Sequence, residues 1–511
     1  MVRAMRMFLL GVAVLSVGCA TANRSKRPAE FAATPGRTGP LAELEKRLEP
    51  TLGAERSAFK LIERNDEALT WRLALIDSAQ SSLDLMTFLW WGDEVGDLVL
   101  SRVLAAADRG VKVRLIVDDM STLDESAGMQ LRDVPNAAID AHPNIELRVF
   151  NPFKNRKVVG RAVEFLGDFD RLNQRMHNKA LIADNHAAIM GGRNLGNEYM
   201  GLATAFNFRD LDVITVGHAS RQVSGVFDRY WNSEWVRPQA EIAVGTEATL
   251  RAEVARLHQH LEAATILASF PQAPREWSGE LVALEGQLFP GTSSVVTDTP
   301  DGDKVTHRLP ELVRELWASA QQEVLVTNAY IIPNELAFEH TRKELKEGVR
   351  FVMLTNSLGS TDAAGVHLHY SDWRPRMVAG GVELYEFKHD AEVRTRVVDT
   401  APVSSKFVGL HAKAMVIDRK RVLIGSMNLD PRSWVHNSEM GILIDCAELG
   451  AALAAMIEGD LKPANSWQVT LDDKGQVQWV SGKEVRHVAP VRDEAQRGEE
   501  FIPRLLPADL Y

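Results

Sequence analysis

One short segment occurs twice in the chain, and its repetition limits what the chain can fold into. Residues 176–184 read MHNKALIAD, and residues 410–418 read LHAKAMVID. Six residues after each copy comes a second match, GGRN at 191–194 and GSMN at 425–428. Every matched residue of the second copy carries a number 234 higher than its counterpart. Chance would not keep one register over both parts, so the chain contains two related halves.

The duplication extends to the helices and strands that are predicted around the motif. In the first half, a helix around 71–78 precedes a strand at 83–89, a helix ending at 108–110 and a buried strand at 111–117. The second half repeats this order at 316–320, 324–327, 346–348 and 349–354. Strands that alternate with helices predict an α/β fold with a largely parallel sheet in each half, covered on both faces. The motif itself reads as a hairpin, which makes each sheet mixed.

The motif gathers groups that suit a phosphodiester. Because a strand alternates its faces, His177 and Lys179 project to one side, and His411 and Lys413 do the same. A turn and a returning strand then bring the glycines and the asparagine beside each His/Lys pair. Glycine lets a backbone approach a ligand closely, and an asparagine amide can donate a hydrogen bond to an anionic oxygen.

The pattern resembles the phospholipase D superfamily, whose duplicated His-Lys-Asp signature and trailing Gly-Ser-x-Asn both copies match. The similarity covers nearly all of the chain after about residue 60, and it points to the bacterial cardiolipin synthase branch, especially the C-type synthases. The stretches that carry this resemblance are FNPF at 150–153, DFDRLN at 168–173, TNSL at 355–358 and DPRS at 430–433. The resemblance implies two phospholipase D-type α/β sandwich halves that form an internal pseudo-dimer around one active site.

The resemblance also implies roles for the motif residues. One histidine attacks phosphorus to form a phosphohistidine, and the other moves protons for the alcohols. On resemblance we assign attack to His177 and acid/base work to His411. The groups expected to hold the phosphate oxygens are Lys179, Lys413, Asn194, Asn428 and Ser426. Gly192 replaces the serine in the first copy, so we expect a hydroxyl contact to phosphate on one side only.

Acidic residues receive two kinds of role. Asp210 and Glu439 lie at the family positions that orient the histidines through the other ring nitrogen. The alternative for Asp210 is a surface ion pair with Arg209. Asp184 and Asp418 belong to the signature, but their place in turns predicts structural hydrogen-bond acceptors away from the phosphate.

A weaker expectation concerns His367 and Arg374, which share a helical face in a synthase-like stretch. These side chains are candidates for contact with a lipid headgroup, and a packed or solvated helix face is the alternative.

The N-terminus predicts export. Residues 1–18 combine basic residues with an apolar run that is too short to span a bilayer, as in a signal peptide. Small residues precede Cys19, as in a bacterial lipoprotein cleavage box, although Ser16 stands where that box prefers leucine. We therefore expect a lipidated Cys19 and a membrane-anchored protein facing the periplasm, at the outer membrane if the cell has two membranes. The alternative is an ordinary signal peptide with an incidental cysteine.

Composition and periodicity predict how the rest of the chain is divided into segments. We expect a lipidated tether and N-terminal helix at 19–60, the first half at 61–240, a connecting segment at 241–290 and the second half at 291–460. A C-terminal hairpin and tail follow at 461–511, because DDKG at 472–475 separates two strand-like runs.

The net charge and the cysteine content reduce the number of possible functions. The net charge of −11 counts against a general nucleic-acid binder, although a local basic cleft remains compatible with it. The only other cysteine, Cys446, lies in an apolar stretch, and no Cys/His cluster has the spacing of a zinc site. We expect no metal and no cofactor, and the sequence indicates no obligate protein partner.

These observations predict an enzyme that acts on phospholipid substrates. Our first hypothesis is a phosphatidyl transferase of cardiolipin synthase type that uses phosphatidylglycerol, alone or with phosphatidylethanolamine. A hydrolytic phospholipase D is the first alternative, and a phosphodiesterase acting on nucleic acid is the second. A non-enzymatic lipid-binding envelope protein would be expected to carry a broken signature, and both copies are intact.

Overall fold

We analysed a computed structural model of the chain, which describes residues 28–53, 55–124, 130–302, 304–494 and 496. Cys19 and the expected signal peptide lie outside the described residues. No helix within the described ranges is long and apolar enough to cross a bilayer.

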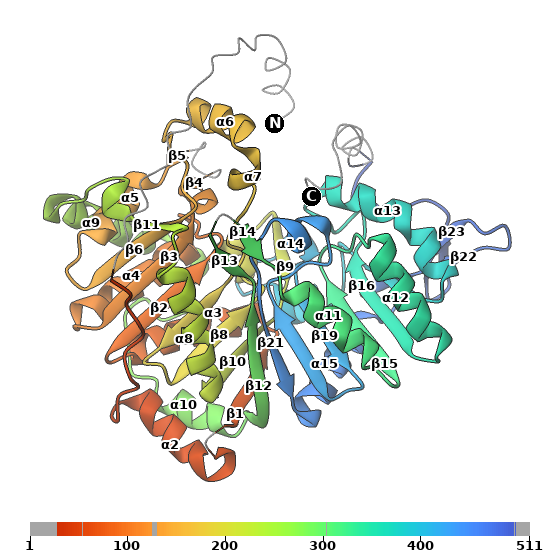
Figure 1. The fold of residues 1–511 in the computed structure, drawn as a ribbon, viewed down its shortest axis with the longest axis horizontal. Coiled ribbons are helices and arrows are strands. Elements are labelled where there is room, and N and C mark those ends of the chain that lie inside the picture. The colour runs from red at the N-terminus through yellow and green to blue at the C-terminus, as the bar shows by residue number, and fades with distance from the viewer. Residues whose placement is uncertain (1–27, 54, 125–129, 303, 495, 497–511) are drawn as a thin grey trace.

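The first half is built on eight strands of one mixed sheet (Figure 1). From the outer edge inward they are β11 (Val236–Pro238), β6 (Ile145–Phe150), β3 (Lys112–Asp118), β2 (Ser82–Thr87), β7 (Ala180–Ala183), β8 (Ala187–Gly191), β10 (Asp212–Gly217) and β1 (Ser57–Ile62). Only β2, β3 and β6 run parallel to one another.

The second half continues the same sheet. β1 pairs with β12 (Phe289–Thr297), so the described chain has one 18-stranded sheet rather than two separate ones. The strands that follow outward are β21 (Met440–Asp445), β20 (Arg421–Gly425), β19 (Lys413–Ile417), β15 (Glu323–Asn328), β16 (Arg350–Asn356), β17 (Glu383–Phe387), β22 (Ser466–Leu471), β23 (Val477–Ser481) and β24 (Glu484–Arg486). Here β15, β16 and β17 are the parallel strands.

The predicted α/β class and its duplication are therefore confirmed, with one difference in topology. Each half has a parallel centre of three strands, and antiparallel pairs surround it. The sheet is less parallel than strand–helix alternation predicted, because the motif hairpin and its neighbours join antiparallel to the centre.

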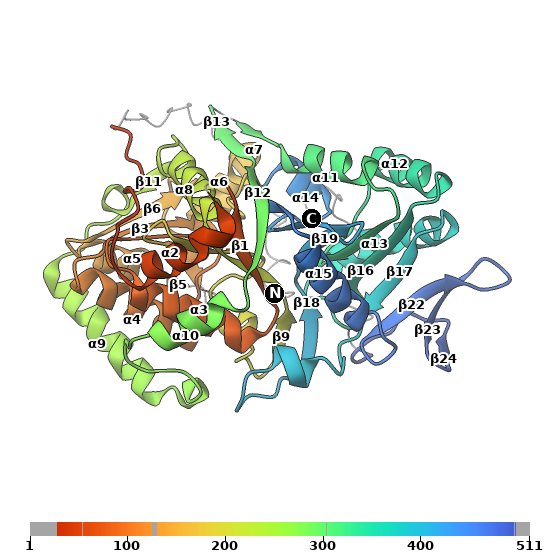
Figure 2. The ribbon, with the colours of Figure 1, turned by 90° about the horizontal axis from the view of Figure 1, so that it is seen from below.

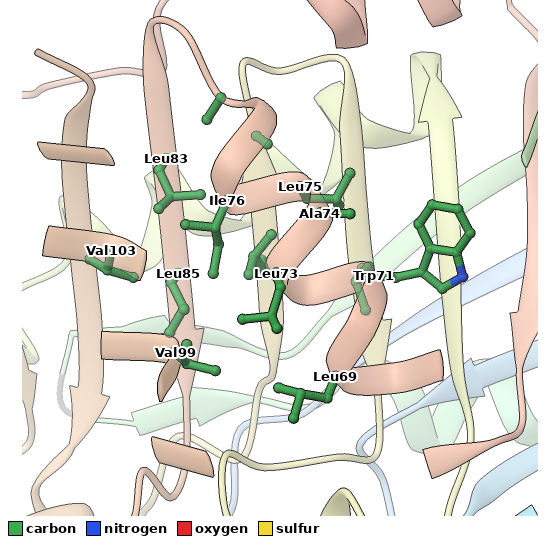
Figure 3. Packing of buried hydrophobic residues seen from close by; sticks show 14 of the residues in the cluster. Leu69, Trp71, Leu73, Ala74, Leu75, Ile76, Leu83, Leu85, Val99 and Val103 are labelled. Atoms are coloured by element: carbon green, nitrogen blue, oxygen red, sulfur yellow. The ribbon is translucent and has the colours of Figure 1, made fainter. Parts of the chain in front are cut away.

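Helices cover both faces of the sheet, as Figures 1 and 2 show. α3 (Asn65–Ser78) and α4 (Glu94–Asp108) pack on one face of the first half, as Figure 3 shows, and α2 (Pro40–Leu52) joins their hydrophobic core. α11 (Leu309–Ala318), α12 (Glu335–Lys346) and α13 (Ala364–Ala379) share a core with the second half. α8 (His218–Trp231) and α15 (Ala447–Asp460) share a third core that contains residues of both halves. Burying each large aliphatic side chain in such cores contributes about 1.5–3 kcal/mol.

Shorter elements connect these layers. Between the halves lie α9 (Glu247–Ala263) and α10 (Ser278–Glu285), which belong to the expected connecting segment. Three further helices, α5 (Asp133–Asp140), α6 (Val158–Gly167) and α7 (Phe169–Leu172), precede the first motif, and α14 (Pro431–Val435) follows the second. Small sheets are formed by β4 (Leu123–Asp124) with β5 (Gln130–Leu131), by β13 (Thr299–Asp301) with β14 (Lys304–Thr306), and by β9 (Phe206–Arg209) with β18 (Phe407–Leu410).

The two motif hairpins turn at the signature aspartates. Asp184 and Asn185 have φ of 52° and 60°, and Asp418 and Arg419 have φ of 50° and 54°, which is the left-handed pair of a tight hairpin turn. The Asp184 carboxylate accepts from the backbone N–H groups of residues 80–82. Asp418 accepts from those of residues 321–323. Both carboxylates thus fasten the turn to the strand beside it.

Candidate active site

Two parallel contacts between the halves bring the histidines to their positions. β9 pairs with β18 so that Arg209 faces Leu410, and the residues that directly follow the two strands are Asp210 and His411. At the second contact, Met176 bridges Ser438 in parallel, and the next residues are His177 and Glu439. Backbone hydrogen bonds hold both registers, from His411 N–H to the Arg209 carbonyl at 2.8 Å and from His177 N–H to the Ser438 carbonyl at 2.9 Å.

Each histidine is therefore bound by a carboxylate from the other half. The Nδ1 of His177 lies 2.9 Å from Glu439 Oε2, and the Nδ1 of His411 lies 2.6 Å from Asp210 Oδ2. Both carboxylates are fully buried. A carboxylate on Nδ1 fixes the tautomer that leaves Nε2 available for chemistry. Asp210 forms this contact, and it is Arg209 that makes ion pairs elsewhere, with Glu63 and Asp460.

The two lysines lie beside the histidines in matching ways. Lys179 Nζ donates to the carbonyl of His177 at 2.6 Å, and Lys413 Nζ donates to the carbonyl of His411 at 2.5 Å. Both lysines are 3% exposed. Burial holds the pKa of Lys179 well below its usual range, and the charge of Lys413 lowers it further. The charge of Lys413 also adds to the effect of burial and of Lys179 in lowering the pKa of His177. The structure thus gathers both His/Lys pairs into one site.

The motif asparagines are also buried near this site. Asn194 Oδ1 accepts from the N–H of Leu89 at 3.2 Å. The Oδ1 of Asn428 is buried and makes no hydrogen bond with any described residue. An amide that is buried without a full set of partners is suited to receive a polar ligand.

Ser426 has buried hydrogen-bond partners that the sequence did not indicate. Its hydroxyl donates to Glu439 Oε2 at 2.5 Å and accepts from the N–H of Met440 at 3.1 Å. The serine therefore holds the carboxylate that orients His177, and its contact with a phosphate stays a prediction.

Gly192 occupies the position in the first copy that is equivalent to Ser426, and there is a steric reason for a glycine there. A Cβ built on Gly192 would lie 2.2 Å from Asp210 Oδ1, because the shorter aspartate brings its carboxylate over the glycine. In the second copy the longer Glu439 leaves space for a serine, which then supports it. The two differences between the copies, Gly in place of Ser and Asp in place of Glu, therefore depend on each other sterically.

Sequence reasoning missed a pair of residues that hold the chain just before each histidine. At the carboxyl end of β3, Asp118 accepts from the N–H of Met176 at 2.8 Å, and its other oxygen lies 3.3 Å from Arg175. At the matching end of β16, Asn356 accepts from the N–H of Leu410 at 2.8 Å. The side-chain amide of Asn356 also donates to the carbonyls of Ala329 and Leu410. The one sequence signal for this role is that Asp118 and Asn356 occupy equivalent positions in the two halves, each at the end of a parallel strand.

His367 and Arg374 lie in a buried network under α13. Arg374 Nε donates to Glu386 Oε1 at 2.7 Å, and its Nη2 lies 3.2 Å from the Nε2 of His367. Trp479 donates to the other oxygen of Glu386 at 2.7 Å. Since His367 is 3% and Arg374 5% exposed, these side chains pack α13 against the sheet, in line with the alternative of a packed helix face.

Electrostatics make the two His–carboxylate pairs unequal. Burial and the neighbouring lysines hold the pKa of His177 well below its usual range. Burial and the charge of Lys413 lower the pKa of His411 to about 4. Burial opposes ionisation of Asp210, but attraction to His411 and Lys413 outweighs it and lowers the pKa of the carboxyl. At Glu439 burial outweighs the opposing attraction of Lys179 and raises the pKa to about 7.

Among the described residues, no group of three or more histidine, cysteine, aspartate and glutamate side chains is arranged to hold a metal ion. Cys446 is buried, and it accepts from the N–H of Leu449 at the start of α15.

Comparison with known proteins identifies the class to which this fold and site belong. Residues 73–231 and 313–461 match the family described as "Cardiolipin synthase, PLD-like domain", once in each half. The chain belongs to this family.

Individual relatives agree with the family. The chain is 33% identical to cardiolipin synthase C of Escherichia coli (strain K12) over 427 residues, which cover 82% of this chain and 88% of the relative. It is 23% identical to cardiolipin synthase B of the same strain, over 79% of this chain and 80% of the relative. Among solved structures, phosphatidylserine synthase of Haemophilus influenzae aligns with a TM-score of 0.53 at 14% identity, over 81% of this chain and 89% of that one. The last comparison shows a shared fold.

The packing at Gly192 predicts that restoring sequence symmetry will damage the site. We expect Gly192→Ser to lower kcat by about 100-fold or more, because the added side chain displaces Asp210 from His411. The matched variant Ser426→Gly removes one hydrogen bond from Glu439 without a clash, so its loss should be smaller. Turnover of a phosphodiester substrate and the melting temperature would be measured for both. A fully active and stable Gly192→Ser protein would contradict this account.

The buried lysine at the second motif predicts an alkaline limit to activity. Burial lowers the pKa of Lys413 to about 8. The charged form is the one that attracts a phosphate oxygen, so kcat/KM should fall as the pH rises through about 8. Lys413→Arg keeps its charge at that pH, so its reduced activity should lack this limb. The pH dependence of kcat/KM for both proteins tests the assignment, and an identical alkaline limb in the variant would refute it.

Proposed function

We propose that this protein is a phosphatidyl transferase that forms cardiolipin from phosphatidylglycerol, alone or with phosphatidylethanolamine. The observation that carries the proposal is the single site in which each half orients the other half's histidine. Two histidines with Nδ1 held by carboxylates, beside two buried lysines, supply a nucleophile, a proton carrier and positive charge. The relatives named cardiolipin synthase support the lipid class.

The proposed reaction has two displacements at one phosphorus. In the first, Nε2 of His177 attacks phosphorus, the bond to the departing alcohol breaks, and protonated His411 gives its proton to that alcohol. In the second, His411 takes the proton from the hydroxyl of an incoming phosphatidylglycerol. That oxygen attacks phosphorus, and the bond to His177 breaks. Lys179 and Lys413 hold the non-bridging oxygens as charge redistributes.

The starting protonation states follow from the same contacts. His411 has a carboxylate partner whose pKa is lowered, so Asp210 stays ionised and can support an imidazolium. Burial and, after it, the charge of neighbouring lysines lower the pKa of both histidines, and the negative charge of a bound phosphate opposes the effect of the lysines. Substrate binding therefore favours a proton on His411 before the first step.

The same intermediate could be resolved by water, which makes hydrolysis the principal alternative. The burial of both histidines favours transfer, because water is restricted and a lipid hydroxyl can be presented in its place. The nuclease alternative is disfavoured by the net charge of −11.

We further propose that Cys19 is lipidated and holds the enzyme at the periplasmic side of an envelope membrane. Fractionation of a Cys19→Ser protein would test that anchor.

The products of defined lipid mixtures separate these activities. We expect purified protein incubated with labelled phosphatidylglycerol, with or without phosphatidylethanolamine, to yield cardiolipin. Thin-layer chromatography or mass spectrometry of the lipids provides the measurement, with the His177→Ala protein as the blank. Phosphatidic acid as the sole product in every mixture would establish the hydrolase instead. Cleavage of single-stranded DNA without lipid turnover would establish the nuclease.

Trapping the intermediate tests which histidine attacks. With an activated phosphodiester donor, His411→Asn should accumulate labelled phosphoenzyme, because attack by His177 needs little help when the leaving group is already acidic. His177→Asn should accumulate none. Acid-labile, base-stable label after gel filtration is the measurement. The opposite pattern would exchange the two roles.

A further inference from the structure

The amphipathic helix α6 is turned with its apolar side toward solvent. Val159, Val163 and Leu166 are spaced by four and three residues and so form one stripe along the helix. Their exposures are 71%, 61% and 69%, which place them among the most exposed large apolar side chains of the described chain. A surface helix of a water-soluble domain normally buries such a stripe.

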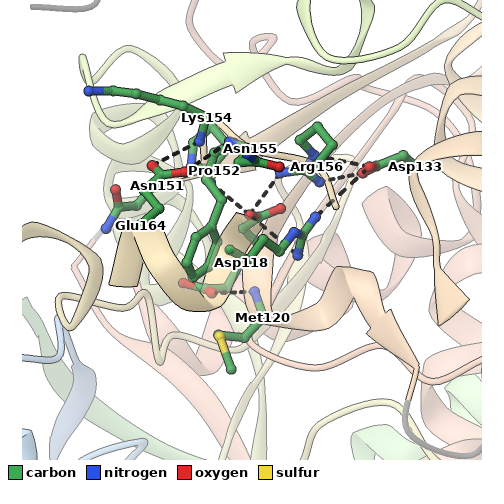
Figure 4. A network of polar contacts seen from close by, with 12 residues as sticks. Asp118, Met120, Asp133, Asn151, Pro152, Lys154, Asn155, Arg156 and Glu164 are labelled. Carbon is green, nitrogen blue, oxygen red and sulfur yellow. Dashed lines mark hydrogen bonds and ion pairs between the residues drawn. The ribbon is translucent and has the colours of Figure 1, made fainter. Parts of the chain in front are cut away.

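The opposite side of α6 is charged and faces the protein. Arg161 is 3% exposed and lies 3.7 Å from Asp119 and 3.9 Å from Asp133. Glu164 accepts from the N–H groups of Lys154 and Asn155 and from Arg171. Figure 4 shows the network that fixes this side, including Asp133, Arg156 and Glu164. Rotation of α6 to bury its valines would break these contacts and leave buried charges unpaired.

Short segments of the chain connect α6 to the site. α7 follows α6 directly, and His177 comes five residues after the end of α7. Asn173, just after α7, accepts a hydrogen bond at 2.9 Å from Arg432 of the α14 segment that precedes Glu439. In Figure 1, α6 and α7 project beyond the body at the end of the sheet where α14 lies.

Charge at the start of α6 indicates what its apolar side contacts. Lys154 and Lys157 are exposed and immediately precede the helix. An apolar stripe flanked by lysines is the composition of helices that lie in the interface of an anionic membrane. Lysine side chains complement phosphate headgroups, and valine and leucine side chains are suited to the acyl boundary.

We propose that α6 docks the enzyme on the surface of a phospholipid bilayer, with Val159, Val163 and Leu166 inserted and Lys154 and Lys157 on the headgroups. This inference rests on the proposed function, because an enzyme that takes a lipid from a bilayer must bring the mouth of its site to the membrane. It adds a second contact to any anchor at the N-terminus. It also defines which side of the protein faces the lipid.

Vesicle binding tests the docking surface in the full chain. The variant Val159→Ser/Val163→Ser/Leu166→Ser should bind vesicles of phosphatidylglycerol and phosphatidylcholine about tenfold more weakly than the parent. A matched control, Val244→Ser/Val282→Ser/Leu336→Ser, removes three other exposed apolar side chains and should bind as the parent does. Lys154→Gln/Lys157→Gln should weaken binding to vesicles with phosphatidylglycerol but not to vesicles of phosphatidylcholine alone. Unchanged binding of the α6 triple variant would overturn the proposal.

Activity on two forms of the substrate separates docking from chemistry. The α6 triple variant should lose about tenfold or more of its rate on long-chain phosphatidylglycerol in vesicles and keep its rate on dissolved short-chain phosphatidylglycerol. Equal loss on both forms would show damage to the site and overturn the docking role. A parent protein inactive on both would refute the proposed function, while vesicle binding would still report on α6. Loss of self-association in the triple variant, with vesicle binding unchanged, would assign the surface to a second copy.

Discussion

The active site depends on two hydrogen bonds that cross between the halves of the chain. His177 receives its carboxylate from Glu439, and His411 receives its carboxylate from Asp210. Neither half therefore contains an oriented histidine of its own. The pairing of β1 with β12 joins the halves into one sheet, and the short parallel contacts at β9–β18 and Met176–Ser438 set the register of each pair. A slip of one residue at either contact would turn the carboxylate away from its histidine.

The duplicated site is symmetric in outline and asymmetric in chemistry. Asp210 is short, lies against Gly192 and has a lowered pKa, whereas Glu439 is longer, is supported by Ser426 and has a pKa raised to about 7. An ionised partner stabilises a charged imidazole more strongly than a partner that is partly protonated. The proton carrier is best placed beside Asp210, which supports the assignment of that role to His411. The Gly/Ser and Asp/Glu differences between the copies are therefore consistent with the proposed roles of the two histidines.

Part of this arrangement was predictable because periodicity and spacing encode it locally. Tight turns at Asp184 and Asp418 follow from short strands separated by polar residues, and the duplication predicted two similar halves. Contacts between segments that lie far apart in the sequence were harder to predict. Nothing in the local sequence indicates that Ser426 binds Glu439, or that Asp118 holds the N–H of Met176. The helical face of His367 and Arg374 looked like a ligand surface, because spacing alone does not show that Glu386 and Trp479 lie opposite it.

The orientation of α6 was hidden for the same reason, and it bears on how a buried site can act on lipids. A hydrophobic stripe in the sequence ordinarily predicts the side that packs inward, but here the salt bridges of Arg161 decide the rotation of the helix. Burial of the histidines would protect the proposed phosphohistidine from water, yet it also makes the site hard to reach for a lipid in a bilayer. The proposed docking of α6 would hold the enzyme against the bilayer while the histidines stay enclosed. Membrane docking and transfer in place of hydrolysis would then follow from the same geometry.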